Sequence, residues 1–215
     1  MAYSLIITAG GASSRYGKSN KLLEKIDALT VIEHSLAPFL KINEITQIII
    51  PANISIIDEL NTIFSGSNII IIEGGETRQE SVYNALQIVK EEYVIIHDGA
   101  RPLVSEEIIN NIISSVKKYN AVSTMVKTTD TIKEVDSSGK IIRTIDRDKL
   151  YNTQTPQAFK TEIIKFAHEK LRGKNFTDDS SMLEALDIPV YITEGNYKNI
   201  KITSKSDLDF AKIYI

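Results

Sequence analysis

The 215-residue sequence contains no cysteine, and its formal net charge is only −3. The absence of cysteine excludes disulfides, zinc–thiolate sites and thiol nucleophiles. The balanced charge argues against broad nucleic-acid binding, which needs a large positive excess, but it leaves room for a local basic pocket. The apolar runs at residues 48–50 and 69–72 are far too short to span a membrane. The short apolar stretch near the N-terminus, at residues 5–8, has no basic segment before it, so it indicates a first strand and not a signal peptide. We therefore expect a cytoplasmic protein that binds neither nucleic acid nor membrane.

The composition that remains is typical of a globular chain, with 42% hydrophobic and 25% charged residues. The length suits one domain, so we expect residues 1–215 to form a single unit. Short runs rich in isoleucine and valine, which suit strands covered on both faces, lie at residues 5–8, 47–50, 69–73 and 93–97. Helical spacing separates them, for example at residues 105–119, where Ser105 is a fair N-cap. The pattern predicts a Rossmann-like α/β fold, with a layered, mostly parallel sheet and helices on both faces.

The alternation breaks between residues 128 and 148. Two β-rich segments, 130–135 and 140–145, flank a turn sequence at 136–139, which predicts a β-hairpin arm inserted into the α/β unit. A lone hairpin needs something to pack on, and a partner subunit is one candidate. Beyond the arm we expect a helix at 160–171, strands near Val190 and Ile200, and a closing helix after residue 206.

The loop after the first strand carries the strongest chemical signal. Gly10 and Gly11 let backbone amides approach a ligand, and Arg15, Lys18 and Lys21 add three positive charges. Loops at the carboxyl ends of parallel strands are where α/β folds bind ligands. The pattern indicates a polyphosphate cradle; the alternative is a glycine- and serine-rich surface loop with solvated lysines.

A phosphate-binding loop of the kinase type is a weaker interpretation of the same residues. That motif has four residues between its glycines, and here five separate Gly11 from Gly17. Because the ring of amides is tight, one extra residue is a serious misfit.

Two further polar loops follow the third and fourth predicted strands. Arg78 and Ser81 stand where a helix begins and can bind a phosphate or a nucleobase; the alternative is a capped helix with a solvated arginine. Asp98 can hold Mg²⁺ or a ribose, and Arg101 can clamp a phosphate; the alternative is an internal Asp–Arg pair that shapes the turn. All three loops should converge on one edge of the sheet.

These segments together resemble the 2-C-methyl-D-erythritol 4-phosphate cytidylyltransferase family. The motifs that carry the resemblance are, in chain order, Ala9-Gly-Gly-Ala-Ser-Ser-Arg15 with Lys21, Gly74-Gly-Glu-Thr-Arg78-Gln-Glu-Ser81, His97-Asp-Gly-Ala-Arg-Pro102, Asp130-Thr-Ile-Lys133, Asp146-Arg147, Gln154-Thr-Pro-Gln157, Thr177-Asp178 and Asn199-Ile-Lys201-Ile-Thr203. The family transfers CMP from CTP to the phosphate of methylerythritol phosphate with Mg²⁺ and releases pyrophosphate.

The resemblance implies roles for individual residues. Arg15 and Lys21 match the catalytic pair that stabilises charge on the α-phosphate. Nucleotide contacts are implied for Ala9, Gly10, Gly11, Gly74, Arg78, Ser81, Asp98 and Lys201. Contacts to the sugar phosphate are implied for Arg101, Thr131, Arg147, Thr177 and Lys201. Asp98 is the implied metal ligand, and the arm at 128–148 is implied to form a homodimer in which Arg147 reaches the neighbouring subunit's site.

One departure from the family pattern affects the first loop. The family has seven steps from the loop arginine to the loop lysine, whereas six separate Arg15 from Lys21, without the usual proline. Lys18 can therefore share the role of Lys21. Three other functions compete with this interpretation: a ribitol 5-phosphate cytidylyltransferase, which has similar loops, a phosphate-loop kinase and a non-catalytic nucleotide-binding module.

Overall fold

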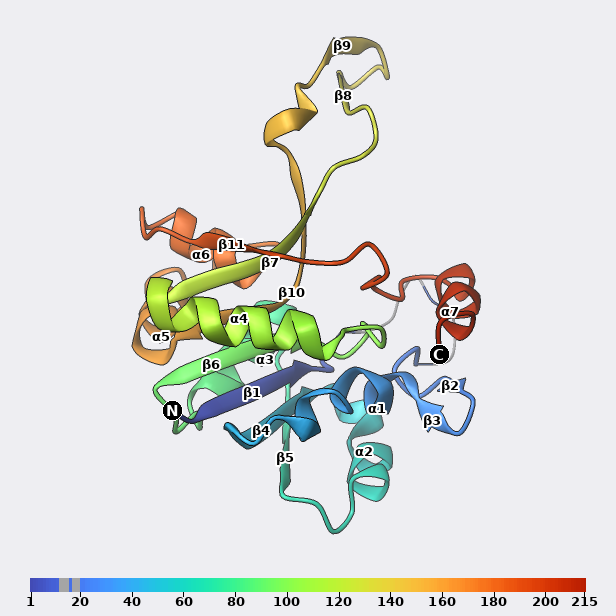
Figure 1. The fold of residues 1–215 in the computed structure, drawn as a ribbon, viewed down its shortest axis with the longest axis vertical. Coiled ribbons are helices and arrows are strands. Elements are labelled where there is room, and N and C mark those ends of the chain that lie inside the picture. The colour runs from blue at the N-terminus through green and yellow to red at the C-terminus, as the bar shows by residue number, and fades with distance from the viewer. Residues whose placement is uncertain (12–15, 17–19) are drawn as a thin grey trace.

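The computed structural model describes residues 1–11, 16 and 20–215, and these form a seven-stranded sheet (Figure 1). From one edge to the other the strands are β11 (Tyr191–Glu194), β7 (Ala121–Lys127), β10 (Tyr151–Lys160), β6 (Tyr93–Asp98), β1 (Tyr3–Thr8), β4 (Ile45–Ala52) and β5 (Ile69–Glu73). β6, β1, β4 and β5 are mutually parallel, as is the pair β11–β7. The prediction of a mostly parallel sheet is confirmed.

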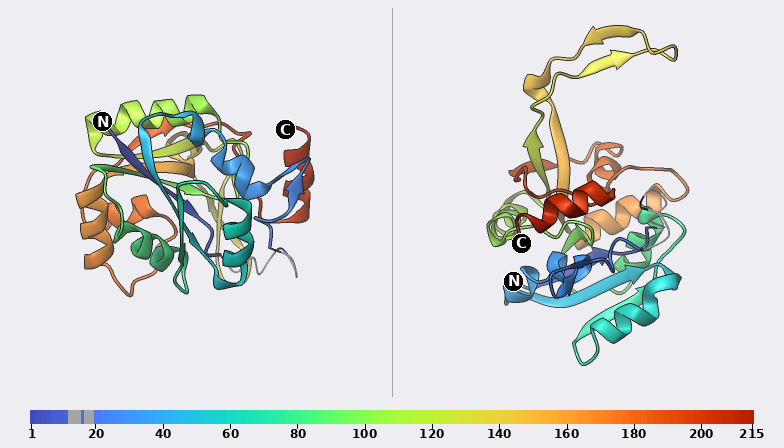
Figure 2. Two further views of the ribbon diagram at one scale, coloured as in Figure 1. Left: turned by 90° about the horizontal axis from the view of Figure 1, so that it is seen from below. Right: turned by 90° about the vertical axis from the view of Figure 1, so that its right-hand side faces the viewer.

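Helices cover both faces of the sheet (Figure 2). One face is covered by α1 (Val31–Leu36), α2 (Ile57–Ile63), α4 (Glu106–Tyr119) and α7 (Lys205–Lys212), and the other by α3 (Arg78–Leu86), α5 (Thr161–Lys170) and α6 (Asp179–Glu184). The shorter elements are the pair β2 (Lys25–Ile26) and β3 (Leu29–Thr30) and the 3₁₀ turns η1 (Phe39–Lys41), η2 (Ile54–Ile56) and η3 (Arg147–Lys149). Among the helices of the described residues, none is long and apolar enough to cross a membrane.

β1 shows why both faces need cover. Leu5 and Ile7 point into the core layer that contains α4, while Ile6 points into the opposite layer with α3 and α5. All three side chains are fully buried. Successive strand residues face opposite sides, so an uninterrupted apolar run requires a helix layer on each.

β10 was not predicted, and it is antiparallel to both of its neighbours, β6 and β7. It escaped detection because its residues are neither an apolar run nor an alternation, and because Pro156 interrupts it. The polar side chains of Gln154, Thr155 and Gln157 are nevertheless buried, and Gln157 donates to Ser123 Oγ at 2.9 Å. The Pro156 carbonyl accepts from the hydroxyl of Thr124 on β7 at 2.7 Å. The pairing with β7 shifts register between Thr153 and Gln157, which accommodates the proline.

The predicted strand near Ile200 is wrong, whereas the one near Val190 is confirmed as β11. Residues 199–203 run across the end of the sheet without a ladder. Separate hydrogen bonds hold their backbone instead. The Arg101 side chain donates to the Asn199 carbonyl at 2.6 Å, and Ile202 N–H donates to the Ala100 carbonyl at 2.8 Å. The alternation of Ile200 and Ile202 suggested a strand because both side chains pack against the core, but this segment pairs with no strand.

The predicted hairpin is confirmed, and it stands away from the main sheet in Figure 1. β8 (Lys133–Val135) pairs with β9 (Ile141–Thr144) around a turn in which the Asp136 carboxylate accepts a bond from Lys140 N–H at 3.0 Å. Val135, Ile141 and Ile142 are more than half exposed, at 53%, 58% and 57%. In a single chain the arm therefore leaves apolar side chains in water.

The helix starts that matter for the loops follow the sequence signals. Thr77 and Glu80 form a capping box at the start of α3, and Ser105 caps α4 as predicted. The Asp178 side chain accepts from Ser181 N–H and caps the start of α6.

His97, at the end of β6, ties three segments together beneath the loops. It is fully buried and packs against the ring of Phe39. Its Nε2 lies 3.4 Å from the Arg101 carbonyl, which can only accept, so Nε2 carries the proton. Its Nδ1 then accepts from the Thr155 hydroxyl at 3.1 Å, and Thr155 accepts from Asp98 N–H at 3.0 Å. Burial, aided by the Arg101 and Lys201 charges, lowers the pKa of His97 from 6.5 to about 3.

This neutral histidine makes stability depend on pH. Between pH 6.5 and about 3 the unfolded chain binds a proton at His97 that the folded chain does not, so acid favours unfolding. We expect His97→Gln to remove a slope of about 1.4 kcal/mol per pH unit from the free energy of unfolding in this range. Urea unfolding of both proteins between pH 7 and 4.5 measures the slope. Val94→Ala, which removes buried β6 volume without a titrating group, should keep the wild-type slope; the same slope in His97→Gln would contradict the assignment.

Candidate active site

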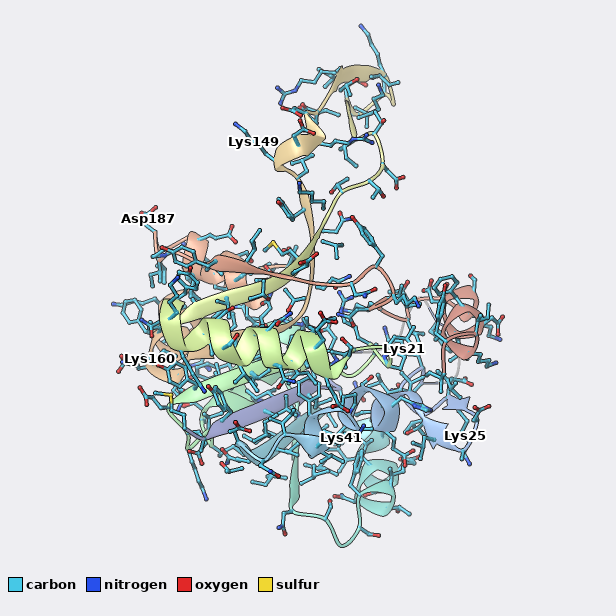
Figure 3. All side chains as sticks on the ribbon, viewed as in Figure 1. Lys21, Lys25, Lys41, Lys149, Lys160 and Asp187 are labelled. Carbon is cyan, nitrogen blue, oxygen red and sulfur yellow. The ribbon has the colours of Figure 1, made fainter. Side chains whose placement is uncertain are left out.

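A cavity of about 250 Å³ opens at the carboxyl ends of the parallel strands, where the three predicted loops converge. Of the residues predicted from sequence, it is lined by Gly10, Gly11, Lys21, Arg78, Ser81, Asp98 and Lys201. Figure 3 shows Lys21 on the same side of the sheet as α7. Arg15 and Lys18 lie outside the described residues.

Two loops meet over the fully buried Ser81 at the second turn of α3. A Cβ placed on Gly10 would come within 2.3 Å of Ser81 Oγ, and one on Gly74 within 2.7 Å. Ser81 also accepts from Gly75 N–H at 3.0 Å and donates to the Thr77 carbonyl at 2.9 Å. Glycine is required at both positions by this close approach. Ala9, buried at 1% exposure, forms a bridge to Ala52 directly behind the cavity.

Asp98 is the electrostatic centre of the cavity. Its side chain is 7% exposed, and its Oδ2 lies 2.8 Å from Lys201 Nζ and 3.6 Å from Arg101 Nε. Its Oδ1 accepts from Arg78 Nε at 3.3 Å and from the Thr8 hydroxyl, also at 3.3 Å. The Asp98–Arg101 pair, which the sequence offered as the alternative interpretation, is therefore present, and Arg78, at 25% exposure, is paired and not solvated.

The cations decide the charge state of this carboxylate. Burial alone would raise the pKa of Asp98, but the charges of Arg78, Lys201 and Arg101 outweigh burial and hold that pKa well below its ordinary value. Asp98 is thus an anion at neutral pH. Three cations around one carboxylate leave an excess of positive charge, which suits a phosphate-bearing ligand.

A second cavity, of about 260 Å³, adjoins the same ion cluster. It shares Arg78, Asp98 and Lys201 with the first, so these three side chains form a wall between the two cavities. Arg101 and Thr177, which the resemblance assigns to the sugar phosphate, line the second cavity and not the first. The arrangement can hold two anionic ligands in two cavities that share one charged wall.

Arg101 joins the wall to the segment that carries Lys201. Burial lowers the pKa of Arg101 despite the attraction of Asp98. The Nη1 atom of Arg101 donates to the Asn199 carbonyl at 2.6 Å. Asn199, itself fully buried, donates to the Thr155 carbonyl at 2.9 Å and to Gln154 at 3.2 Å. Lys201 is thereby placed although its segment is not a strand.

The donor set at Asp98 bears on a divalent metal. Among the described residues, no group of three or more His, Asp or Glu side chains is placed to hold a metal ion. Asp98 can provide one oxygen, and Mg²⁺ commonly takes one or two carboxylates together with substrate phosphates. The residues therefore fit a magnesium ion that arrives with a nucleotide, and they do not form a cage for a resident metal.

Thr131 and Arg147 lie on the arm and line neither cavity of their own chain. Arg147 is exposed and donates to the Thr129 carbonyl. Lys149, two residues further along, stands on the arm well apart from Lys21 in Figure 3.

Sequence reasoning missed several residues that line the two cavities. They are Tyr16, Leu22 and Thr203 in the first, and Gln154, Thr155 and Gln157 in the second. The second set lies within the Gln154-Thr-Pro-Gln157 motif, but its position in the fold could not be predicted because β10 was not. Asp179 was also missed, and it binds Arg78 Nη1 at 2.8 Å from behind the wall.

Comparisons with known proteins agree along the whole chain. A family model described as 2-C-methyl-D-erythritol 4-phosphate cytidylyltransferase matches residues 3–215. The protein of that name from Caldanaerobacter subterraneus subsp. tengcongensis is 40% identical over 225 residues, which cover 100% of this chain and 99% of that protein. The namesake from Dictyoglomus thermophilum is 41% identical over 219 residues, covering 94% of this chain and 92% of that protein.

Among solved structures, 4-diphosphocytidyl-2C-methyl-D-erythritol synthase from Anaerococcus prevotii matches with a TM-score of 0.88 and 34% identity, over 99% of this chain and 97% of that chain. The agreement extends from the first strand through the arm to the last helix. This protein belongs to the 2-C-methyl-D-erythritol 4-phosphate cytidylyltransferase family.

Proposed function

We propose that this protein transfers CMP from CTP to 2-C-methyl-D-erythritol 4-phosphate, yielding 4-diphosphocytidyl-2-C-methyl-D-erythritol and pyrophosphate. Family membership supports the reaction. The wall of Arg78, Asp98 and Lys201, which lines two cavities, is the observation that assigns the reaction to this site. CTP occupies the first cavity, beside the loops that carry Gly10 and Gly11. The sugar phosphate occupies the second, near Arg101 and Thr177.

The chemistry is a displacement at the α-phosphorus of CTP. An oxygen of the sugar phosphate attacks it, the bond to the β-phosphate bridge breaks, and pyrophosphate leaves with that oxygen. The nucleophile is already ionised, so no general base is needed. The protein's contribution is to hold two anions together and to stabilise the extra charge in the transition state, the role proposed for Arg15 and Lys21. Lys201, at the shared wall, can bind phosphate oxygens of both substrates.

Mg²⁺ completes the nucleotide site in this proposal. The ion neutralises phosphate charge when bound, and Asp98 is the residue that would hold it. Lys201, now 2.8 Å from Asp98, then turns to the substrate phosphates. Both substrates are charged phosphate compounds, and we place the activity in the cytoplasm.

The arm completes the second cavity from a partner subunit. Its exposed apolar residues need cover, and Arg147 does not reach either cavity of its own chain. A homodimer through residues 128–148 satisfies both conditions, with Thr131 and Arg147 at the partner's sugar phosphate. An arginine suits this role because it grips a phosphate through two nitrogens.

Pyrophosphate release tests the function directly. We expect release from CTP only when methylerythritol phosphate is present, and little from ATP, because polar groups matched to cytosine stay unpaired with adenine. Ribitol 5-phosphate in place of methylerythritol phosphate separates the sister activity. Equal rates with ATP and CTP, or γ-phosphate transfer from ATP, would contradict the proposal. CTP binding without any turnover would indicate a non-catalytic nucleotide-binding module.

The loop cations should affect turnover more than CTP affinity. We expect Arg15→Ala and Lys21→Ala each to lower kcat by on the order of 10²–10³, the usual cost of losing one transition-state donor. Steady-state kinetics with CTP varied separates kcat from KM. Lys18→Ala is the matched comparison: if it is inactive while Lys21→Ala is nearly wild type, the catalytic lysine is Lys18.

Subunit mixing tests the role of the arm. Lys21→Ala and Arg147→Ala homodimers should each be weak, since each lacks a residue in both sites. After subunit exchange, a heterodimer contains one site with both residues intact, so activity should reappear in the mixture. Exchange is followed independently by mixing differently tagged chains. Demonstrated exchange without recovered activity means that Arg147 does not act across the interface.

A further inference from the structure

Arg78 is held from two sides by two carboxylates. Its Nε lies 3.3 Å from Asp98 Oδ1 on the cavity side, and its Nη1 lies 2.8 Å from Asp179 Oδ2 on the far side. The shorter contact is thus the one to the residue that lines neither cavity. This pairing fixes the plane of the guanidinium, because two of its nitrogens are bound in different directions.

Asp179 is itself rigidly placed. It is 1% exposed and is the first residue of α6, whose N-cap is Asp178. Its other oxygen lies 3.2 Å from Nε2 of the buried His168 on α5. Burial would raise the pKa of Asp179, but the Arg78 charge and the His168 hydrogen bond hold it below its ordinary value. Elements α3, α5 and α6 therefore meet at one ionised carboxylate.

The balance of charge explains why the wall needs this second carboxylate. Without Asp179, the cations Arg78, Arg101 and Lys201 would share Asp98 alone. Arg78 would then be drawn toward Asp98 and would compete with Lys201 for the same oxygens. With Asp179 in place, Arg78 keeps its position on the wall while Lys201 is available to phosphate.

We propose that Asp179 is a positioning residue for the nucleotide, which acts by holding Arg78 in the wall between the two cavities, and that His168 holds Asp179 in turn. This inference rests on the proposed function, since it assigns CTP to the cavity that Arg78 lines. Asp179 does not touch substrate. Its effect on CTP passes through Arg78.

Calorimetric titration of CTP with Mg²⁺, alongside steady-state kinetics, tests the proposal. Asp179→Asn keeps the shape and removes the charge, and we expect it to weaken CTP binding about tenfold or more, with a matching rise in KM, as when one member of a buried ion pair is lost. Glu184→Gln removes an exposed charge from the same helix and should bind CTP like the wild type. Unchanged CTP affinity in folded Asp179→Asn overturns the proposal.

A double-mutant cycle separates positioning from general destabilisation. If Asp179 works through Arg78, the Asp179→Asn change should cost little further CTP affinity in an Arg78→Ala background. A merely structural Asp179 would cost the same in both backgrounds, and that result overturns the proposal.

A second variant serves if Asp179→Asn does not fold. His168→Leu removes the donor to Asp179 but leaves the Arg78–Asp179 pair, so CTP affinity should fall by a smaller factor than in Asp179→Asn or Arg78→Ala. His168→Gln, which can restore an N–H donor, should recover most of the loss; failure of Gln to differ from Leu counts against the proposal. A wild-type protein that binds no CTP would refute the proposed function itself, which is a different outcome from normal binding with an indifferent Asp179.

Discussion

The site depends on one buried carboxylate. Asp98 is withdrawn from water at the end of β6, and such a group is tolerated only when it is paired and hydrogen-bonded. Its partners come from three separate parts of the chain: Arg78 at the start of α3, Arg101 in the following turn, and Lys201 near the C-terminal helix. Removing one partner from a buried pair typically costs about 3–5 kcal/mol, so the ion cluster ties these segments together as well as forming the wall between the cavities.

Much of this could be predicted from the sequence, because the local signals were strong. The isoleucine runs of β4 and β5 indicated strands, and the N-cap Ser105 indicated the helix α4. The rule that ligands bind at the carboxyl ends of parallel strands brought the loops of Gly10, Arg78 and Asp98 together. The features that could not be predicted depend on polar contacts between residues far apart in the sequence. β10 has no hydrophobic period, and Gln157 is buried only because Ser123 and Asp178 receive its amide. Asp179 also escaped, because nothing in the local sequence distinguishes it from the neighbouring Asp178.

The arm gives the molecule a second constraint. Two strands cannot build a core, and the exposed side chains of Val135, Ile141 and Ile142 carry an apolar surface that water disfavours. Within one chain the arm also keeps Arg147 outside both cavities. A subunit interface resolves the two problems at once, and this is why dimerisation and catalysis are linked in the proposal. In the proposal a second chain covers the arm, and the sequence of one chain does not say where that cover lies.

The central claim is that CTP and the sugar phosphate lie on opposite sides of the wall of Arg78, Asp98 and Lys201. A crystal structure with Mg²⁺, a CTP analogue resistant to transfer and methylerythritol phosphate measures this most directly. The account predicts the nucleotide in the cavity of Gly10 and Gly11, the sugar phosphate beside Arg101, and the α-phosphorus next to Lys201. Both ligands in one cavity, or an α-phosphorus remote from Lys201, would contradict it.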